Sequence, residues 1–148
     1  MPTIRQQVRD AVEAALNGVG KPGGLTIGMA RKRPAKAAEL PLSMIVMHKE
    51  TTKRNSDSVR APVVERTMRM AIDHWVSDAE DPQAALEAQL DWATTAIVGS
   101  GLLGNTVRDI TEDETQWDWE NLELQFGRAT QWFTIKFTTK TNDQELKQ

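Results

Sequence analysis

The chain contains 148 residues, of which 39% are hydrophobic and 26% are charged, and it has no cysteine. This size and composition fit one globular domain with its own core. The absence of cysteine excludes a disulfide framework, a thiolate metal site and a cysteine nucleophile. No apolar run approaches the roughly 20 residues of a membrane-spanning helix, and the opening segment MPTIRQQVRDAV lacks the apolar stretch of a secretory signal. We therefore expect a protein that is made in the cytoplasm and has no contact with a membrane.

The net charge of −3 conceals two halves of opposite sign. Residues 1–70 carry 13 Lys and Arg against 6 Asp and Glu, whereas residues 71–148 carry 5 against 15. A basic half of this kind is compatible with nucleic-acid binding. It is equally compatible with head-to-tail association, in which the basic surface of one subunit meets the acidic surface of its neighbour. The charge distribution alone leaves both classes open.

The first predicted element is a helix that Thr3 can cap, with Gln6 as its capping-box partner. Apolar residues follow at helical spacing, at Ile4, Val8, Ala11, Val12 and Ala15, and the helix ends at Asn17-Gly18. Residues 18–41 contain five glycines and three prolines, which prevent a continuous helix. We interpret them as an extended arm with a short strand near residues 25–29. The positive charge of this arm comes mainly from Arg31, Lys32, Arg33 and Lys36.

A β-hairpin is predicted next. Residues 42–48 are apolar along most of their length, and residues 63–76 alternate between apolar and polar side chains, which is typical of a strand. The segment between them, residues 49–60, is mainly polar and charged, so we predict that it forms a long exposed tip. The cations of this tip are Lys49, Lys53, Arg54 and Arg60.

A second helix is predicted after the hairpin, with Asp81 as its cap and Pro82 at its first position. Its apolar stripe and its glycine terminator are Leu86, Leu90, Ala93, Ile97 and Gly99. Strands are then predicted at residues 106–110, 122–126 and 129–139, with an acidic stretch at 112–120, a turn at Gly127-Arg128 and a flexible tail at 140–148.

The fold class that follows is α+β. We expect a single domain over residues 1–148, in which two helices pack on a mainly antiparallel sheet of four to five strands. No internal repeat and no linker between domains is visible in the sequence.

No motif with a complete set of catalytic or metal-binding residues is found in the sequence. Gly18-Val19-Gly20-Lys21 lacks the preceding strand and the following Ser or Thr of a phosphate-binding loop, and Gly99-Ser100-Gly101 does not have the spacing of a nucleophile elbow. His48 and His74 could approach each other on adjacent strands, but two imidazoles need further ligands to hold a metal. We therefore expect no enzymatic activity, no cofactor and no metal.

The residues that remain as candidates for function are surface charges and aromatics. The acidic stretch supplies Glu112, Asp113 and Glu114, and Trp117 and Trp119 lie within it as potential interface anchors. The basic arm and tip are not interleaved with aromatics, as nucleic-acid-binding surfaces usually are. Contacts with other proteins are therefore favoured over specific reading of nucleic acid.

Several segments in their order resemble the tail terminator proteins of long-tailed bacteriophages. An N-terminal helix and a charged excursion precede "RAPVVERTMRMAIDHWV", after which come "DPQAALEAQLDWATTAIV", "GLLGNTVRDITEDETQWDWE" and "FGRATQWFTIKFTT". The resemblance covers residues 3 to 140 and rests on order and local composition, since no catalytic signature takes part in it. The glycine- and lysine-rich arm at 18–41 departs from the pattern.

The resemblance implies a homo-oligomeric ring, typically a hexamer, at the head-proximal end of the virion's tail. Such a ring stops polymerisation of the tail tube protein and offers a surface to the head–neck connector proteins, while DNA only passes through its lumen. By analogy, the tip at Lys49–Arg60 would reach a neighbouring subunit or the tube. Another head–tail connector or tail-completion protein of similar fold is an alternative, and a nucleic-acid-binding module is a more distant one.

Overall fold

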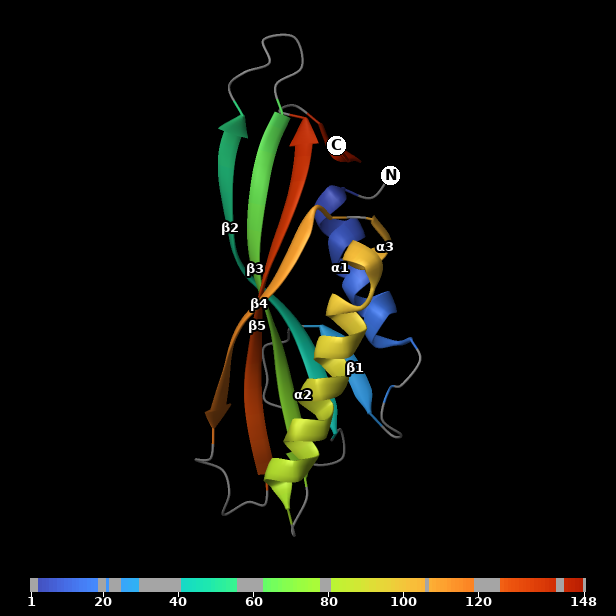
Figure 1. The fold of residues 1–148 in the computed structure, drawn as a ribbon, viewed down its shortest axis with the longest axis vertical. Helices are drawn as coiled ribbons and strands as arrows, with labels where there is room; N and C mark the ends of the chain where they lie inside the picture. The colour runs from blue at the N-terminus through green and yellow to red at the C-terminus, as the bar shows by residue number, and fades with distance from the viewer. Residues whose placement is uncertain are drawn as a thin grey trace.

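A computed structural model describes residues 3–18, 21, 25–29, 41–55, 63–77, 81–105, 107–118, 126–140 and 143–147. Its elements in chain order are α1 (Ile4–Leu16), β1 (Thr26–Met29), β2 (Leu42–Asn55), β3 (Val63–Ser77), α2 (Pro82–Val98), α3 (Gly101–Asn105), β4 (Asp109–Asp118), β5 (Phe126–Lys140) and β6 (Asp143–Lys147). The molecule is elongated, and its long strands run along its long axis (Figure 1).

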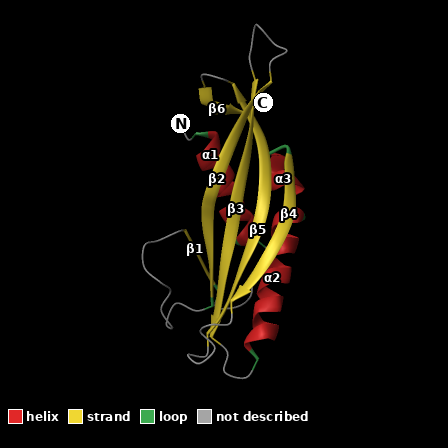
Figure 2. Cartoon of the chain, turned by 90° about the vertical axis from the view of Figure 1, so that its left-hand side faces the viewer, coloured by secondary structure: helices red, strands yellow, loops and turns green. Residues whose placement is uncertain are grey.

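The sheet has the strand order β1-β2-β3-β5-β4, and β6 pairs with the end of β5. Neighbouring strands from β2 to β4 are antiparallel, whereas β1 runs parallel to β2. The α+β class and the mainly antiparallel sheet were therefore predicted correctly. The main path of the sheet has five strands, within the predicted number, whereas β6 at the end of β5 and the short helix α3 were not predicted. The helices lie on one face of the sheet, and no described element covers the other face (Figure 2).

The two long helices form where their capping residues predict. The Thr3 side chain accepts a hydrogen bond from the Gln6 backbone N–H at 3.2 Å, and the Asp81 side chain accepts one from the Ala84 N–H at 3.0 Å. These caps satisfy backbone donors that have no partner within the helix. Each helix then turns an apolar stripe toward the sheet, with Ile4, Val8, Val12 and Leu16 buried on α1 and Leu86, Leu90, Ala93 and Ile97 buried on α2.

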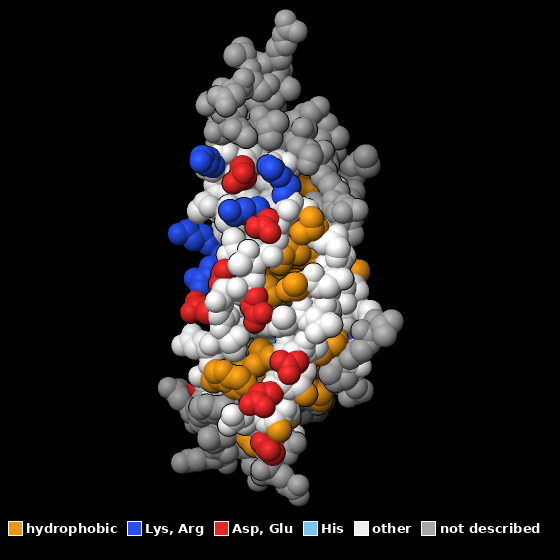
Figure 3. Space-filling view, in the orientation of Figure 1, with side chains coloured by type: hydrophobic (Ala, Val, Ile, Leu, Met, Phe, Trp, Pro, Cys, Tyr) orange, Lys and Arg blue, Asp and Glu red, His pale blue; other side chains and the backbone are white. Residues whose placement is uncertain are grey.

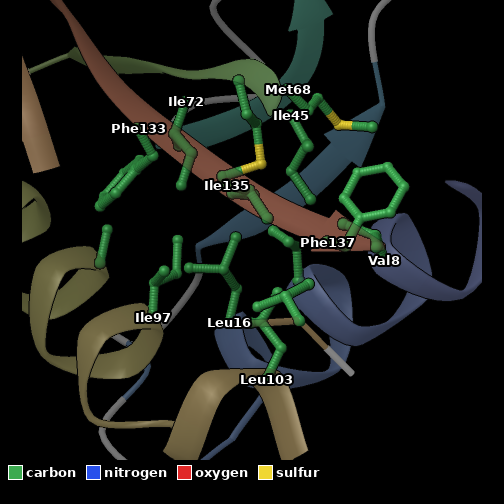
Figure 4. Close-up of a cluster of buried hydrophobic side chains, with 14 of the residues drawn as sticks. Val8, Leu16, Ile45, Met68, Ile72, Ile97, Leu103, Phe133, Ile135 and Phe137 are labelled. Carbon is green, nitrogen blue, oxygen red and sulfur yellow. The ribbon is translucent and has the colours of Figure 1, made fainter. Parts of the chain in front are cut away.

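The core lies between these helices and the alternating residues of the central strands. Met68, Met70 and Ile72 of β3 contact the same cluster as Phe133, Ile135 and Phe137 of β5, and all six are at most 4% exposed. Figure 4 shows Ile72, Phe133 and Ile135 pointing from the sheet toward the helices that carry Leu16 and Ile97. The period-two pattern of the sequence thus determines which face of the sheet is buried.

The hairpin strands extend further than predicted. Residues 49–55, which were expected to belong to the exposed tip, continue β2 and pair with β3 from Arg69 to Val63. The strand tolerates polar residues here because β3 satisfies its backbone while the side chains of Lys49 and Lys53 stay exposed. The rest of the predicted tip, residues 56–60, and most of the predicted arm lie outside the described residues. The short strand predicted near residues 25–29 is confirmed as β1.

The acidic stretch, for which no strand was predicted beyond residue 110, is part of a strand. Asp109–Asp118 forms the ten-residue strand β4, since β5 offers an edge along which it can pair from Lys136 to Arg128. The predicted strand at 106–110 accordingly starts three residues later. Most of the strand predicted at 122–126 lies outside the described residues. The tail predicted to be flexible contains β6, which pairs with the end of β5 that β4 does not reach.

Gly127 does not form the predicted turn with Arg128, because both lie inside β5 opposite Val76 and Trp75. The glycine is needed for a close approach and not for a turn. A Cβ atom at this position would lie 3.0 Å from Leu86 Cδ1, 3.1 Å from Val76 Cγ2 and 3.2 Å from Pro82 Cβ. The first turn of α2 therefore packs directly on the β5 backbone.

The short element α3 is a left-handed turn, with φ angles of 66°, 56° and 53° at Gly101, Leu102 and Leu103. Left-handed backbone costs a non-glycine residue roughly 1–2 kcal/mol. Two features offset this cost. The Leu103 side chain is only 4% exposed, within the core, and the Ser100 hydroxyl accepts a hydrogen bond from the Leu103 N–H at 2.9 Å. Ser100, which lies between two glycines, therefore has a local structural role.

A buried line of polar side chains joins α2 to the sheet. The Gln89 amide donates to the Leu42 carbonyl and to Ser43 Oγ, each at 3.0 Å, and Ser43 Oγ lies 2.8 Å from His74 Nδ1. On the other side of the ring, His74 Nε2 lies 3.1 Å from Gln131 Oε1. This chain of donors and acceptors assigns the proton of His74 to Nε2, which donates to Gln131, while Nδ1 accepts from Ser43. His74, which had no expected partner, is thus fully hydrogen-bonded.

Substitution of Gly127 by Ala is expected to destabilise the protein by about 1–3 kcal/mol, because the added methyl group would overpack the contact between α2 and β5. Gly28→Ala is the matched control, since the nearest heavy atom to its Cβ, Leu42 Cδ1, lies at an ordinary 3.7 Å. Urea denaturation of the two variants measures the difference. Equal stabilities would show that this approach is not tight.

Acidification is expected to destabilise the fold through His74. Burial lowers the pKa of His74 from 6.5 to about 4, against the opposing effects of Gln131 and Asp73. The unfolded chain therefore binds more protons in this window, so this contribution is complete above pH 6.5 and is lost as the pH falls toward 4. Between pH 7 and pH 5 the loss is about 2 kcal/mol. Urea denaturation of the wild type and of His74→Gln at both pH values isolates the contribution of His74 to the free energy of unfolding. If the stability of the two proteins depended equally on pH, this explanation would be contradicted.

Candidate assembly surface

The structure separates the predicted interface residues into a basic and an acidic group. Lys49 and Lys53 are exposed on β2, at one side of the sheet. Glu112, Asp113, Glu114 and Trp117 lie on β4, at the other side. Of Arg54 only the backbone, in β2, is described, and Arg31, Lys32, Arg33, Lys36, Arg60 and Trp119 lie outside the described residues. The basic arm is therefore untested, whereas the acidic stretch and the near part of the tip have defined positions.

Both sides of the sheet end in unpaired strand edges within the described part of the chain. The strand β4 pairs with β5 alone. On the opposite side, β1 covers only Leu42–Ile45 of β2. From Val46 to Asn55, β2 therefore has a described strand only on its β3 side. Unpaired edges present backbone N–H and C=O groups that can pair with another chain.

The β4 edge is strongly acidic, since five of its ten residues are Asp109, Glu112, Asp113, Glu114 and Asp118. Some of these carboxylates also contact β3 or β5. Glu114 forms an ion pair with Arg69, Asp113 accepts a hydrogen bond from Thr134, and Asp118 lies 3.7 Å from Arg128. These contacts leave much of the strand in solvent, and the Glu114 side chain is 59% exposed.

The sheet face away from the helices carries two cation–aromatic contacts that the sequence did not reveal. The Arg69 guanidinium lies 4.2 Å from the ring centre of Trp132, whose other neighbour is His48 at 4.5 Å. Toward the other end, Arg128 lies 4.8 Å from the Trp75 ring. The partners of each contact lie on different strands, far apart in the sequence, so the contact depends on a strand register that no local pattern specifies.

Arg128 also forms a bidentate ion pair with Asp73, with both N···O distances at 2.9 Å. The hydrogen bonds that Arg128 donates to Asp73 raise the pKa of Arg128, although burial acts in the opposite direction. Asp73 is only 8% exposed, so the guanidinium compensates a carboxylate that would otherwise be buried without a counter-charge. This pair therefore has a structural role.

A hollow of about 540 Å³ lies between α1 and β2, beside the free edge of that strand. Arg5, Arg9 and Lys49 give it positive charge, and Met47 and Met68 form its apolar part. Arg5 donates two hydrogen bonds to the Glu50 carboxylate at 2.8 and 2.7 Å, and Arg66 adds a third at 3.0 Å. The hydrogen bonds from Arg5, more than any other contact, hold the pKa of Glu50 below its usual value.

The charges are also distributed along the long axis. In Figure 3, the Lys and Arg side chains gather in the upper half of the visible face, whereas Asp and Glu side chains continue to its lower end. The upper half contains the end of β2 at Asn55, and the lower end contains the start of α2 (Figure 1). On this face the cations are therefore restricted to the upper half, where acidic side chains also lie, and the lower half is acidic.

The two histidines do not form a site. His74 pairs across the sheet with Ser43 and is fully buried, whereas the exposed His48 lies five residues further along β2. Within the described ranges, no three His, Asp or Glu side chains are close enough to bind a metal ion. In the same ranges, no helix has the length and hydrophobicity needed to cross a membrane.

The Ser43, His74 and Gln131 side chains have the order of a hydroxyl, a base and an orienting group. Catalysis by such a set requires the hydroxyl to reach a substrate. Here the three residues are 0%, 0% and 1% exposed, and Gln89 also donates to the serine oxygen. The arrangement therefore fastens α2 to the sheet and offers no access to a substrate.

No family model matches the sequence, and no curated protein matches it. Among solved structures, the chain is similar to a chain of a structure described as "Virion of native gene transfer agent (GTA) particle". The two share 14% sequence identity with a TM-score of 0.41, over 93% of this chain and 92% of that one. What this chain does is therefore inferred from its own surface.

Replacement of Glu50 by Gln is expected to destabilise the protein by about 2 kcal/mol, because it removes the counter-charge of Arg66, whose side chain is 9% exposed. Glu114→Gln is the matched control, since its ion pair with Arg69 joins side chains that are 59% and 43% exposed and should contribute less than about 1 kcal/mol. Thermal denaturation at neutral pH compares them. A larger loss in the control would contradict the importance assigned to Glu50.

Proposed function

We propose that this protein is a structural subunit of a phage-like particle and that it assembles head to tail into a ring. The observation that carries the proposal is the presence of two unpaired strand edges of opposite charge on opposite sides of one sheet. A ring requires two different surfaces on each subunit that fit each other. A basic edge on β2 and an acidic edge on β4 meet that requirement.

The more specific proposal is a tail terminator: a ring, typically of six copies, that caps the head-proximal end of the tail tube and presents a surface to the head–neck connector proteins. It is supported by the order of elements on which the resemblance rests. The structure contains a helix, a long hairpin, a second helix and further antiparallel strands in that order. Another connector or tail-completion protein of similar fold would share these features.

A structural role, and not an enzymatic one, is part of this proposal. The buried Ser43 and His74 are inaccessible to a substrate, and the Glu50 carboxylate in the α1–β2 hollow is engaged by Arg5 and Arg66. The described cations Lys49 and Lys53 lie on an unpaired edge, where they are placed to meet another protein chain.

The purified protein is expected to form closed rings in low salt, or to form them on tail tubes assembled from the tube protein of the same phage. Six copies of the 16.5 kDa chain would have a mass of about 99 kDa. Native mass spectrometry measures the copy number, and electron microscopy shows whether the protein sits at one end of the tube and limits its length.

The result that would overturn the proposal is a monomer that neither binds tubes nor changes their length at low ionic strength. If this monomer instead shifted duplex DNA in a gel, and the shift weakened steeply as salt was raised, the nucleic-acid-binding alternative would replace it. High salt is the control condition for the ring itself, because screening should weaken contacts between oppositely charged edges.

A further inference from the structure

We propose that the contact between subunits is a β-sheet that continues from one copy to the next, in which β4 of one copy pairs in an antiparallel manner with the free edge of β2 in its neighbour. This inference rests on the proposed assembly into a ring and specifies its interface. The neighbour is a second copy of this chain, and the paired segments are the described strand edges themselves.

The strand directions permit this pairing without turning a subunit over. Each step from β2 to β3, from β3 to β5 and from β5 to β4 is antiparallel, so β4 runs opposite to β2 within one molecule. When two copies lie side by side in the same orientation, β4 of one copy and β2 of the other are therefore antiparallel. A head-to-tail contact between subunits that keep one orientation is what a ring needs.

The free edges also lie at the same height along the sheet. Residues that are cross-strand partners form rows that run across β2, β3, β5 and β4. One row consists of Lys49, Arg69, Thr134 and Thr111, and the next consists of Met47, Met70, Phe133 and Glu112. Copies at equal height would therefore bring β2 residues 46–51 opposite β4 residues 109–114. Both strands have a register irregularity beside these rows, between Met47 and Lys49 and between Glu112 and Glu114.

The side chains on the two edges are complementary in charge. On the face away from the helices, β2 contributes Lys49 and Lys53 to the joined sheet, whereas β4 contributes Asp109 and Glu114. Opposite charges on neighbouring strands of a sheet each contribute favourably to pairing. Pairs of two β2 edges or of two β4 edges would bring like charges together, which disfavours a symmetric dimer through either edge.

The α1–β2 hollow would accept the other face of the arriving strand. Ile110 and Glu112 of β4 lie on the helix side, opposite Ile135 and Phe133. In a neighbour at equal height, Glu112 falls in the row of Met47, which lines the hollow together with Arg5 and Arg9. Ile110 falls in the row of Glu50, whose carboxylate is already paired with Arg5 and Arg66, so Glu112 would meet Met47 at the rim of a hollow that also contains Arg9.

Charges and bulges on edge strands can instead serve to prevent association. Charges of either sign can prevent association, so this protective role does not require the two edges to carry opposite charges. Here the β2 edge is basic and the β4 edge is acidic, and both free segments occupy the same rows of the sheet. The difference in sign favours a contact between copies over simple protection of the edges.

Cysteine cross-linking tests the interface, because the natural chain has no cysteine. Lys49→Cys is combined in turn with Asp109→Cys or Thr111→Cys, both exposed positions on the same face. Within one molecule, positions 49 and 111 are separated by three strand spacings, about 14 Å, which exceeds the limit of about 7 Å for a disulfide. Any disulfide between them must therefore join two copies.

After mild oxidation, at least one double variant is expected to give a ladder of covalent oligomers up to the full ring on a non-reducing gel. A mixture of the two matching single variants should give covalent dimers only, and Lys49→Cys alone should give none. The combination of Lys49→Cys with Thr95→Cys, an exposed position on α2, is the control and should not form a ladder.

If native mass spectrometry detects oligomers but neither double variant gives a ladder, the proposed ring remains intact and this interface is overturned. A ladder in the Thr95 control equal to that in the edge variants would overturn it as well. A protein that stays monomeric with and without tail tubes would overturn both the interface and the proposed function.

Discussion

The structure depends on the strict alternation of β3, the central strand. Its even-numbered side chains from Val64 to Val76 are buried on the helix side, and its backbone pairs with β5 along its whole length and with β2 from Val63 to Trp75. A slip of one residue would turn the entire apolar set to the opposite face. With this register fixed, the polar line through His74 and Gln131 falls beneath α2, and the two outer strands are left at the sides of the sheet.

An open sheet necessarily has two edges, and in this chain the two edges carry opposite charges. The basic first half supplies β2 and the helix α1 beside it, whereas the acidic second half supplies β4. The charge asymmetry of the sequence thus becomes an asymmetry between two sides of one surface. Ion pairs between the two halves, such as Arg69 with Glu114, compensate only part of it.

Much of the fold was predictable because local signals agreed with the tertiary structure. The caps at Thr3 and Asp81, the helical stripes and the alternation of β3 and β5 all appear as expected. The errors occurred where partners distant in sequence decide the outcome. Acidic β4 is a strand because β5 is available to pair, and Gly127 lies in a strand because α2 needs a close approach. The acidic candidates were found from composition, but the hollow with Arg5 and Arg9 depends on the placement of α1 beside β2, which no spacing in the sequence specifies.

The central claim is that copies of this chain join through their sheet edges. It is tested most directly by a cryo-electron microscopy map of the assembled ring at a resolution that separates β-strands, about 4.8 Å apart. The account predicts that β4 of each copy lies one strand spacing from β2 of its neighbour and runs antiparallel to it. A map in which β4 faces solvent in every copy, with the contacts made by the helices instead, would contradict the account.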